Sequence, residues 1–311
     1  MSEYLGLDTS NYTTSAALFD GEIRQRKKLL PVKEGEKGLR QSDALFHHIR
    51  QLPELLEELL AEAGDIRAIG VSTRPRNVEG SYMPCFLAGE TAARALSAYG
   101  KIPIYRTSHQ VGHILAALYS CQRLDLATGD KPFIAFHVSG GTTDCLLVTP
   151  DRENILTCRE ISTSLDLKAG QAVDRVGVML GLKFPCGMEL ERLADESHRK
   201  FKIKPTMRGG NCCLSGIENI CKKMQNDGEP SCDIALYCIK YIEAAIIEMT
   251  ENALSEQGNL PLIYAGGVMS DSIIRESIEN RFDAHFAEPA LSADNACGTA
   301  IFSAIKDGFI K

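Results

Sequence analysis

The feature that most constrains the fold of this chain is a strand–turn–strand pattern that occurs twice. In residues 4–20 an apolar run leads into a polar turn and out into a second apolar run, and residues 133–149 repeat this order. The turns also match in detail, because Ser10-x-x-Thr13-Thr14 aligns with Ser139-x-x-Thr142-Thr143. A repeat of this length indicates two similarly built lobes. Chance similarity between two hairpins is the alternative.

The segments around these hairpins alternate between helical and strand-like patterns. Ser42 is a suitable N-cap for a helix through Ile49, and Pro53 can open a second helix that Gly64 ends. A long amphipathic helix is predicted at about 231–257, followed by a strand at 262–265. Mixed strands and helices in this order favour a layered α/β protein, and 311 residues suffice for two lobes.

Charge and composition limit the possible partners. A net charge of −7 argues against a protein that binds nucleic acid over its whole surface. Basic residues nevertheless gather at 24–40 and 199–208. Such runs are commonly solvated loops, and contact with a polyanion such as tRNA is the alternative. With no secretory signal, no apolar run near ~20 residues and eleven cysteines without C-x-x-C spacing, we expect a cytoplasmic protein without membrane contact.

Two glycine pairs are candidates for binding phosphate. Gly140-Gly141 lies in the turn Ser139–Thr143, where backbone N–H groups and hydroxyls can face an anion. Gly266-Gly267 stands between a strand and a helix N-terminus, a common place for a nucleotide. An ordinary tight hairpin turn explains the first pair equally well.

A histidine pair is the candidate metal site. Thr107 or Ser108 can cap a helix on which His109 and His113 are four residues apart and face the same way, so both imidazoles can approach one ion. Histidines on a polar helix face are the alternative. Asp294 can supply a carboxylate ligand or cap the helix that it begins, and spacing does not choose between these roles.

An ordered series of motifs carries a family resemblance over essentially the whole chain. The motifs are Ser108-His109-x-x-Gly112-His113, Val138-Ser139-Gly140-Gly141-x-Thr143, Ala169-Gly170-x-Ala172-x-Asp174-x-Val176, Leu180-Gly181-Leu182-x-Phe184-Pro185-x-Gly187, Ser215-Gly216, Ala265-Gly266-Gly267-Val268 and Asp294-Asn295-Ala296. In this order they resemble the TsaD-like family, the catalytic subunits of tRNA threonylcarbamoyladenosine synthase, formerly called the glycoprotease or O-sialoglycoprotein endopeptidase family.

The resemblance implies a fold, a reaction and its ligands. The fold is the two-lobed α/β architecture of actin, hexokinase and sugar kinases (ASKHA). We expect an N-terminal lobe at 1–128 and a C-terminal lobe at 129–311, with the helix from about 294 packing back toward the cleft. The reaction is transfer of threonylcarbamoyl from its adenylate to the N6 amine of a tRNA adenosine, by a transferase that works with companion subunits.

The resemblance also assigns ligands to residues. His109, His113 and Asp294 would hold one Fe2+ or Zn2+ ion. The segment Ser139, Gly140, Gly141, Thr142 and Thr143, together with Asp174, Gly187 and Asp271, would bind ATP, AMP or the acyl-adenylate. Asp174 would accept hydrogen bonds from ribose, and Gly187 would allow close approach of the backbone.

The chain departs from the family pattern at the first hairpin. The family reads Glu-Thr-Ser-Cys-Asp-Glu-Thr, and this chain reads Asp8-Thr9-Ser10-Asn11-Tyr12-Thr13-Thr14. Tyr12 and Thr13 therefore occupy the positions of the acidic pair that helps to deprotonate the amine, and a lost base costs on the order of 10²–10⁴ in rate. Elsewhere Thr142 replaces His, Asp271 replaces Asn, and Arg74-Pro75-Arg76 replaces Gly-Pro-Gly.

These departures indicate a divergent paralogue and leave three hypotheses open. The chain is a threonylcarbamoyl transferase with altered base residues, a carbamoyl-type transferase for a different acceptor, or a nucleotide- and metal-binding partner that no longer catalyses. An endopeptidase would need a general base near the metal, and Val111 between the histidines supplies none.

Overall fold

The computed structural model describes residues 2–10, 12–31, 39–292 and 296–310. Their contacts divide them into two compact units. The first comprises Met1–Lys131, Thr149–Cys158 and Ala290–Lys311, and the second comprises Pro132–Val148 and Arg159–Pro289. Both units are discontinuous in sequence, whereas the predicted lobes 1–128 and 129–311 are continuous. The predicted lobe boundaries, and the packing of the segment from about 294 toward a cleft, stay predictions.

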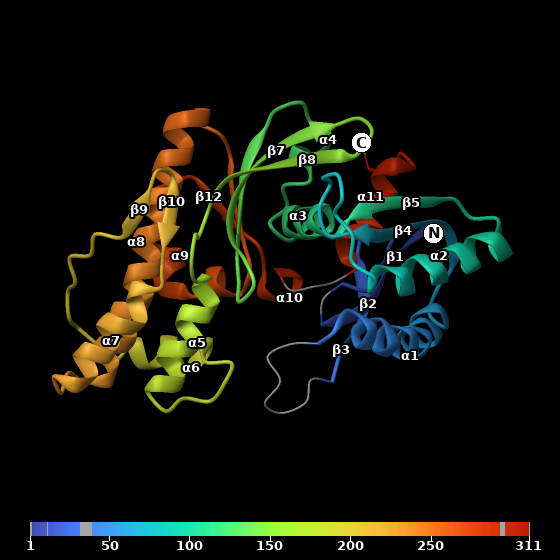
Figure 1. The fold of residues 1–311 in the computed structure, drawn as a ribbon. Helices are drawn as coiled ribbons and strands as arrows, with labels where there is room; N and C mark the ends of the chain where they lie inside the picture. The colour runs from blue at the N-terminus through green and yellow to red at the C-terminus, as the bar shows by residue number, and fades with distance from the viewer. Residues whose placement is uncertain (1, 11, 32–38, 293–295, 311) are drawn as a thin grey trace. The chain divides into compact units, whose positions relative to one another are not determined.

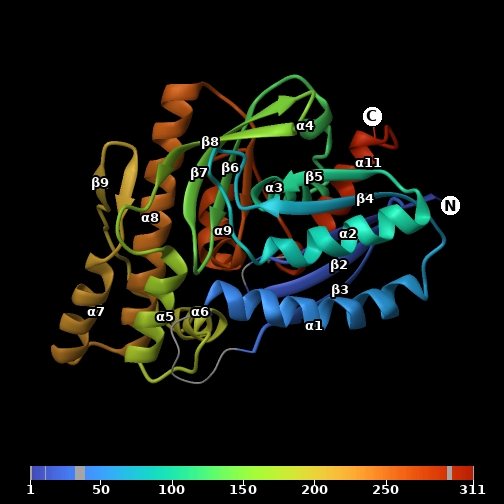
Figure 2. The same cartoon turned by 45° about the vertical axis from the view of Figure 1, so that its right-hand side comes forward.

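The first unit is built on a five-stranded mixed sheet in the order β3-β2-β1-β4-β5. Its strands are β1 (Ser2–Asp8), β2 (Thr13–Phe19), β3 (Ile23–Leu29), β4 (Asp65–Arg74) and β5 (Ile104–Ser108). Its helices are α1 (Gln41–Leu60), α2 (Phe86–Gly100), α3 (His109–Ser120), α4 (Asp125–Thr128), α10 (Pro289–Ser292) and α11 (Cys297–Lys306) (Figures 1 and 2). β1 pairs antiparallel with β2 and parallel with β4.

The two faces of this sheet carry different side chains because residues along a strand alternate between faces. Leu5 and Leu7 of β1 belong to a buried apolar cluster with Leu52, Leu56 and Leu59 of α1. Gly6, between Leu5 and Leu7, faces α11 instead: a Cβ there would lie 2.3 Å from the carbonyl oxygen of Ala296. Helices therefore cover both faces of the sheet.

Two sequence predictions in this unit are wrong. Residues 41–60 form one helix that continues through Pro53, rather than one helix to Ile49 and another from Pro53. The cost of an internal proline, ~3 kcal/mol, is offset because the leucines on both sides of it are buried against the sheet. Residues 23–29, in the basic stretch taken for a loop, form the edge strand β3. Charged side chains on an edge strand oppose pairing with another chain.

The second unit repeats the plan of the first. Its strands are β6 (Phe133–Val138), β7 (Thr143–Asp151), β8 (Ile155–Thr163), β9 (Thr206–Arg208), β10 (Asn211–Cys213), β11 (Leu262–Ala265) and β12 (Ala284–Phe286), and parts of β7 and β8 belong to the first unit. Its helices are α5 (Ala169–Met179), α6 (Gly187–Ala194), α7 (Gly216–Asn226), α8 (Ser231–Gln257), the 3-10 helix η1 (Gly267–Ser270) and α9 (Ser272–Glu279).

The repeat extends from the hairpins to the whole sheets. The second sheet has the order β8-β7-β6-β11-β12, in which β6 pairs antiparallel with β7 and parallel with β11. This matches β3-β2-β1-β4-β5 strand for strand, with the hairpin β6–β7 in the place of β1–β2. The predicted duplication is therefore confirmed at the level of sheet topology. Within the described residues, no helix is long and apolar enough to cross a membrane.

Candidate metal and nucleotide sites

The histidine pair lies on the first turns of α3, in the first unit. Ser108 at the end of β5 has an extended backbone, and its side chain accepts a hydrogen bond from the N–H of Val111 at 3.3 Å. Ser108, one of the two predicted N-caps, thus starts the helix at His109. His113 follows one turn later, on the same face as His109.

The two imidazoles approach each other through their Nε2 atoms. His109 Nε2 and His113 Nε2 are 2.8 Å apart, and the ring centroids are 4.1 Å apart. Two nitrogens that each ligate one ion at 2.0–2.1 Å are ~2.9 Å apart at a right angle and ~3.3 Å apart in a tetrahedral site. The contact has the length of a hydrogen bond between the two rings, and it is also close to the separation of two ligands on adjacent positions of one ion.

A buried carboxylate orients His109 from its other side. Asp8 Oδ2 is 2.7 Å from Nδ1 of His109, and Asp8 Oδ1 accepts from the backbone N–H of Ser10 at 2.8 Å. Asp8 is 1% exposed. The carboxylate holds the proton on Nδ1 and leaves the Nε2 lone pair for a ligand, as carboxylates behind metal-binding histidines do. Sequence reasoning missed this role of Asp8, since 101 residues separate it from His109.

The third predicted ligand, Asp294, lies outside the described residues. In the part of the chain that the structure describes, no group of three or more His, Cys, Asp or Glu side chains has the arrangement of a metal site. The structure thus brings His109 and His113 together, and the set of three ligands stays a prediction. Two imidazoles with a carboxylate behind one of them are a donor set that suits Fe2+ or Zn2+.

A close approach of two helices positions α3. A Cβ added to Gly298 of α11 would lie 1.7 Å from the carbonyl oxygen of Gly112, so only glycine allows the backbones to come this near. Gly112 lies between the two histidines in sequence. The position of both imidazoles therefore depends on the packing of α11 against α3.

The two residues at the positions of the family's acidic pair have different environments. Tyr12 is 43% exposed, and its carbonyl accepts a hydrogen bond from the N–H of Leu30 at 2.7 Å. Thr13 begins β2 and is 7% exposed. Neither side chain is an acid, so neither can act there as the carboxylate base of the family.

In the second unit, the turn between β6 and β7 lies against the N-terminus of α5. The N–H of Gly170 donates to the carbonyl of Ser139 at 3.1 Å, and the N–H of Ala169 donates to Oγ1 of Thr143 at 2.8 Å. Within the turn, Oγ of Ser139 accepts from the N–H groups of Gly141 and Thr142, each at 3.2 Å. No other atom lies within 4 Å of a Cβ added to Gly140 or Gly141. The turn is thus open beside a helix N-terminus, where an anion is favoured.

The other residues predicted to bind the nucleotide also lie in the second unit, on α5 and at the starts of α6 and α9. Asp174 Oδ1 accepts from the N–H of Cys186 at 2.9 Å, so this carboxylate also holds the loop that precedes α6. Gly187 begins α6 with open space at its Cβ position. Glu191 of α6 accepts hydrogen bonds from the backbone and hydroxyl of Ser272 at the start of α9.

Asp271 caps α9 and accepts from the N–H of Ile274 at 3.1 Å. Burial raises the pKa of its carboxyl to about 7, against the lowering effect of the cap hydrogen bond and with a smaller raising effect from Glu191. Near neutral pH the group is therefore partly protonated. Because Asp271 is partly neutral, it would place less negative charge near a bound anion than a fully ionised Asp would in the position of the family's Asn.

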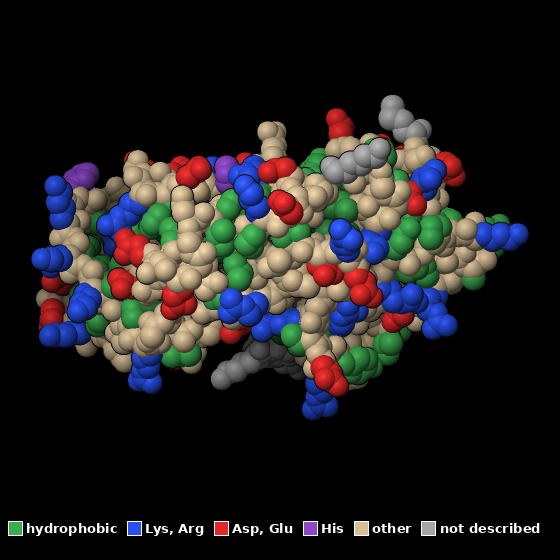
Figure 3. Space-filling view, turned by 90° about the horizontal axis from the view of Figure 1, so that it is seen from above, with side chains coloured by type: hydrophobic (Ala, Val, Ile, Leu, Met, Phe, Trp, Pro, Cys, Tyr) green, Lys and Arg blue, Asp and Glu red, His purple; other side chains and the backbone are tan. Residues whose placement is uncertain are grey.

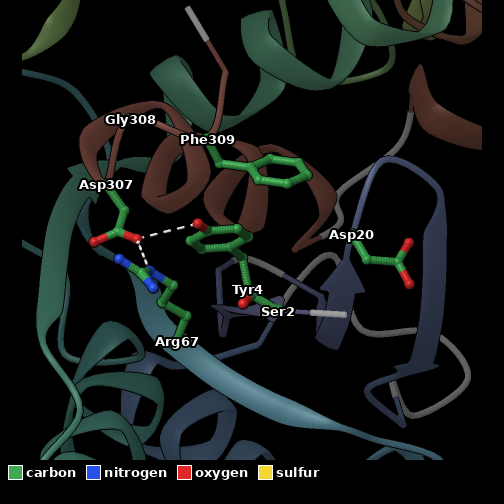
Figure 4. A pocket seen from close by; sticks show the side chains of 7 residues that line it. All are labelled: Ser2, Tyr4, Asp20, Arg67, Asp307, Gly308 and Phe309. Carbon is green, nitrogen blue, oxygen red and sulfur yellow. Dashed lines mark hydrogen bonds and ion pairs between the residues drawn. The ribbon is translucent and has the colours of Figure 1, made fainter.

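A depression of about 350 Å³ in the first unit is separate from the histidine pair (Figure 4). Its Asp307 carboxylate lies between the Tyr4 hydroxyl at 3.1 Å and Nε of Arg67 at 2.5 Å, and the ring of Phe309 packs over Tyr4. Tyr4 is four residues before Asp8 on β1, ~13 Å along the strand. Since its central carboxylate is already paired, we read this depression as an anchor that fastens the end of α11 to the sheet.

Comparison with known proteins places the chain in a family. The model of the family described as tRNA N6-adenosine threonylcarbamoyltransferase (TsaD) matches residues 32–301. The chain belongs to this family. It is 30% identical over 285 residues to a tRNA N6-adenosine threonylcarbamoyltransferase of Methanopyrus kandleri, covering 89% of this chain and 79% of that protein. It is 26% identical to a probable bifunctional tRNA threonylcarbamoyladenosine biosynthesis protein of Thermoplasma volcanium, of which it covers 50%.

Solved structures similar to this TsaD-family chain confirm the predicted fold class, the two-lobed α/β fold of actin, hexokinase and sugar kinases. Component A of (R)-2-hydroxyglutaryl-CoA dehydratase from Acidaminococcus fermentans matches over the full length of both chains with a TM-score of 0.57 and 16% identity. Full-length HypF matches with a TM-score of 0.58 and 12% identity over 98% of this chain and 55% of its own. A ROK family glucokinase from Streptomyces griseus matches with a TM-score of 0.52 and 11% identity, over 96% of this chain and 98% of its own.

Proposed function

We propose that this protein transfers threonylcarbamoyl from its adenylate to the N6 amine of an adenosine in tRNA. Membership of the TsaD family supports a role in tRNA threonylcarbamoyladenosine biosynthesis. The observation that carries the proposal on the chain itself is the pair of Nε2 atoms 2.8 Å apart, with Asp8 behind His109. The reaction would take place in the cytoplasm, with companion subunits.

In the proposed reaction the amine attacks the carbonyl carbon of the threonylcarbamoyl group. A C–N bond forms, the bond from this carbon to the phosphate oxygen of AMP breaks, and one proton leaves the amine. The open turn Ser139–Thr143 beside the N-terminus of α5 would face the phosphate of the adenylate and stabilise the leaving AMP. Asp174, Gly187 and Asp271 would line the remainder of the nucleotide site.

His109 and His113, with Asp294, would hold one Fe2+ or Zn2+ ion, which supplies Lewis acidity when it is bound. Asp8 keeps the proton of His109 on Nδ1 and orients the ring. Ser108 and the packing of Gly112 on Gly298 hold both imidazoles on one face of α3.

Metal binding is tested with His109→Ala and His113→Ala, each measured for bound metal by elemental analysis. His47→Ala, on α1, is the matched control because it also removes one imidazole. We expect each of the first two variants to lose the metal and the control to keep it. A wild-type protein that binds no divalent metal, or variants that bind as the wild type does, would contradict the metal assignment.

Transfer is tested by incubating the protein, together with the companion proteins that co-purify with it, with threonylcarbamoyl-adenylate and an unmodified tRNA transcript and by measuring the modified nucleoside by mass spectrometry. One observation favours a second candidate, a carbamoyl-type transferase for a different acceptor: Tyr12 and Thr13 replace the acidic pair of the family. Nucleotide binding without a modified nucleoside would support that candidate, or a non-catalytic partner, and would reject the first proposal.

A further inference from the structure

The strand β3 and the second basic stretch, residues 199–208, differ in whether carboxylates neutralise their cations. On β3 of the first unit each of three cations has an acidic partner elsewhere in that unit. Arg24 Nη2 is 2.6 Å from Glu3, Arg26 Nη2 is 2.6 Å from Glu62, and Lys28 Nζ is 2.8 Å from Glu54. Most of the positive charge of this strand is therefore already used within the protein, and little remains to attract a polyanion.

The second basic stretch lies in the second unit and presents its cations differently. From Lys200 to Arg208 exposure alternates along the chain. Phe201, Ile203 and Met207 pack against the core of the unit. The exposed positions include the four residues that we name the cationic row: Lys200, Lys202, Lys204 and Arg208. Alternation of this kind is that of an extended chain with one face buried, and it places every charge of the row on the outer face.

The cationic row has no acidic partner among the residues that the structure describes. No carboxylate there forms an ion pair or hydrogen bond with any of its four side chains, whereas the adjacent Arg199 pairs with Glu229 and with Asp233. Arg199 also lies over the ring of Phe201 at 5.0 Å. One cation thus anchors the start of the segment, while the next four point away from the unit.

The row spaces its four positive charges along one extended segment. Its first and last Cα atoms are at most ~26–29 Å apart, eight residues along an extended chain. Arg208 lies beside the turn of the β9–β10 hairpin, where Gly209 has a φ of 60°. In Figure 3, Lys and Arg side chains are frequent at the left end, with Asp and Glu side chains between them, where Figure 1 shows α7 and the segment before β9. Like charges along such a segment repel one another, and a polyanion relieves the repulsion.

We propose that the cationic row binds the phosphate backbone of the tRNA acceptor and that β3 does not. This inference rests on the proposed function, and it distinguishes the cationic row from β3 as the contact with the RNA. An RNA backbone suits the row better than an acidic protein does. The apolar side chains of the segment are half-buried against the core of the unit, so the outer face offers mainly charge rather than the aromatic and apolar centre of a protein interface, in which lysine is depleted. Lysine and arginine on phosphate oxygens position a nucleic acid without reading its sequence.

The size of the effect follows from counterion release. Affinity varies with salt concentration to the power of about −0.7 to −0.9 for each phosphate contact. Between 1 M and 0.15 M salt, one contact therefore contributes about 4- to 5-fold in affinity. Loss of two contacts should weaken binding at 0.15 M about 15- to 30-fold and reduce the salt slope by about 1.4–1.8.

The experiment measures binding of a fluorescent, unmodified tRNA transcript to the full chain by anisotropy between 0.05 and 0.3 M salt, values chosen to span about 0.15 M. The test variant is Lys202→Gln/Lys204→Gln. The matched control is Arg26→Gln/Lys28→Gln, which removes the same charge from β3. Circular dichroism melts check that both variants are folded. We expect the test variant to bind tRNA about 15- to 30-fold more weakly at 0.15 M salt, with a salt slope reduced by about 1.4–1.8. We expect the control to bind as the wild type does.

Three outcomes overturn the inference. The row is not the RNA contact if the test variant binds tRNA as the wild type does, or if the control loses as much affinity. The row is a site for an acidic protein if polyglutamate displaces tRNA at an equal concentration of charge. The proposed function fails on a different result. A wild-type protein that binds tRNA through the row without transferring threonylcarbamoyl would reject the reaction and still support the row as the tRNA contact.

Discussion

Replacement of Asp8 by Asn tests whether this carboxylate prepares His109 for a metal. Asp8 receives two hydrogen bonds, from Nδ1 of His109 at 2.7 Å and from the N–H of Ser10 at 2.8 Å. The two donors lie at different oxygens of the carboxylate, and an amide replaces one of these oxygens by an NH2 group, so one of the two donors would face a donor. Either one buried donor loses its acceptor, at a cost of ~1–3 kcal/mol, or His109 changes tautomer and places its proton on Nε2.

The second alternative blocks the metal, because the proton occupies the lone pair that faces His113. We expect Asp8→Asn to lower metal affinity about 10- to 100-fold, the usual effect of losing a partner behind a ligating histidine. Competition with a chromogenic chelator measures the affinity, and urea unfolding of the metal-free protein measures the stability. Asp20→Asn is the control, because it makes the same substitution in the first unit at a carboxylate that accepts from the N–H of Glu22 at 3.1 Å. Wild-type metal affinity in Asp8→Asn would refute the reasoning.

Three further variants follow from the structure. Asp271→Asn keeps a good N-cap and removes a carboxyl whose pKa burial raises to about 7. The folded wild type holds that proton to higher pH than the unfolded chain does, so its free energy of unfolding falls from about pH 4 through pH 7. In urea melts the variant should be more stable than the wild type at pH 8 by roughly 1–2 kcal/mol, and the two should not differ near pH 4. Gly298→Ala places a Cβ against the carbonyl of Gly112 and should cost ~1–3 kcal/mol with loss of metal binding, whereas Gly216→Ala, which meets no atom within 4 Å, should do neither. Tyr12→Asp returns a carboxylate to an exposed position and should raise the rate of transfer toward the ~10² lower end for a general base; an unchanged rate would show that the amine needs no acid residue there.

Local patterns predicted much of the fold. The repeated turns predict two similarly built lobes, and the two sheets share one topology. Of the two predicted caps, Thr107 and Ser108, the structure has Ser108 at the start of the helix that carries His109 and His113. The helix at 231–257 agrees with α8 at both ends because Pro230 and Gly258 terminate it. These features depend on neighbours in sequence, which is where propensity and capping act.

The features that the sequence analysis predicted wrongly or missed depend on partners that are distant in sequence. β3 is a strand because its backbone pairs with β2, while its charged side chains find partners in Glu3 and in α1, and no local pattern reports those partners. α1 continues through Pro53 because the sheet buries the leucines on both sides of it. The link from Asp8 to His109 also spans distant segments. Where a pairing across the fold outweighs local preference, the sequence alone is a poor guide.

The packing of α11 has a consequence for the order in which the protein is made. Gly6 and Gly70, on neighbouring strands of the first unit, would each clash through a Cβ with the backbone of the segment Ala296–Ala300, and Gly112 of α3 lies against Gly298. These strands are synthesised before the whole of the second unit, yet one face of them stays open until α11 arrives. While the ribosome translates the second unit, one face of these early strands stays exposed. Surface that is exposed in this way is prone to aggregation and is bound by chaperones. The second unit can complete its own core first.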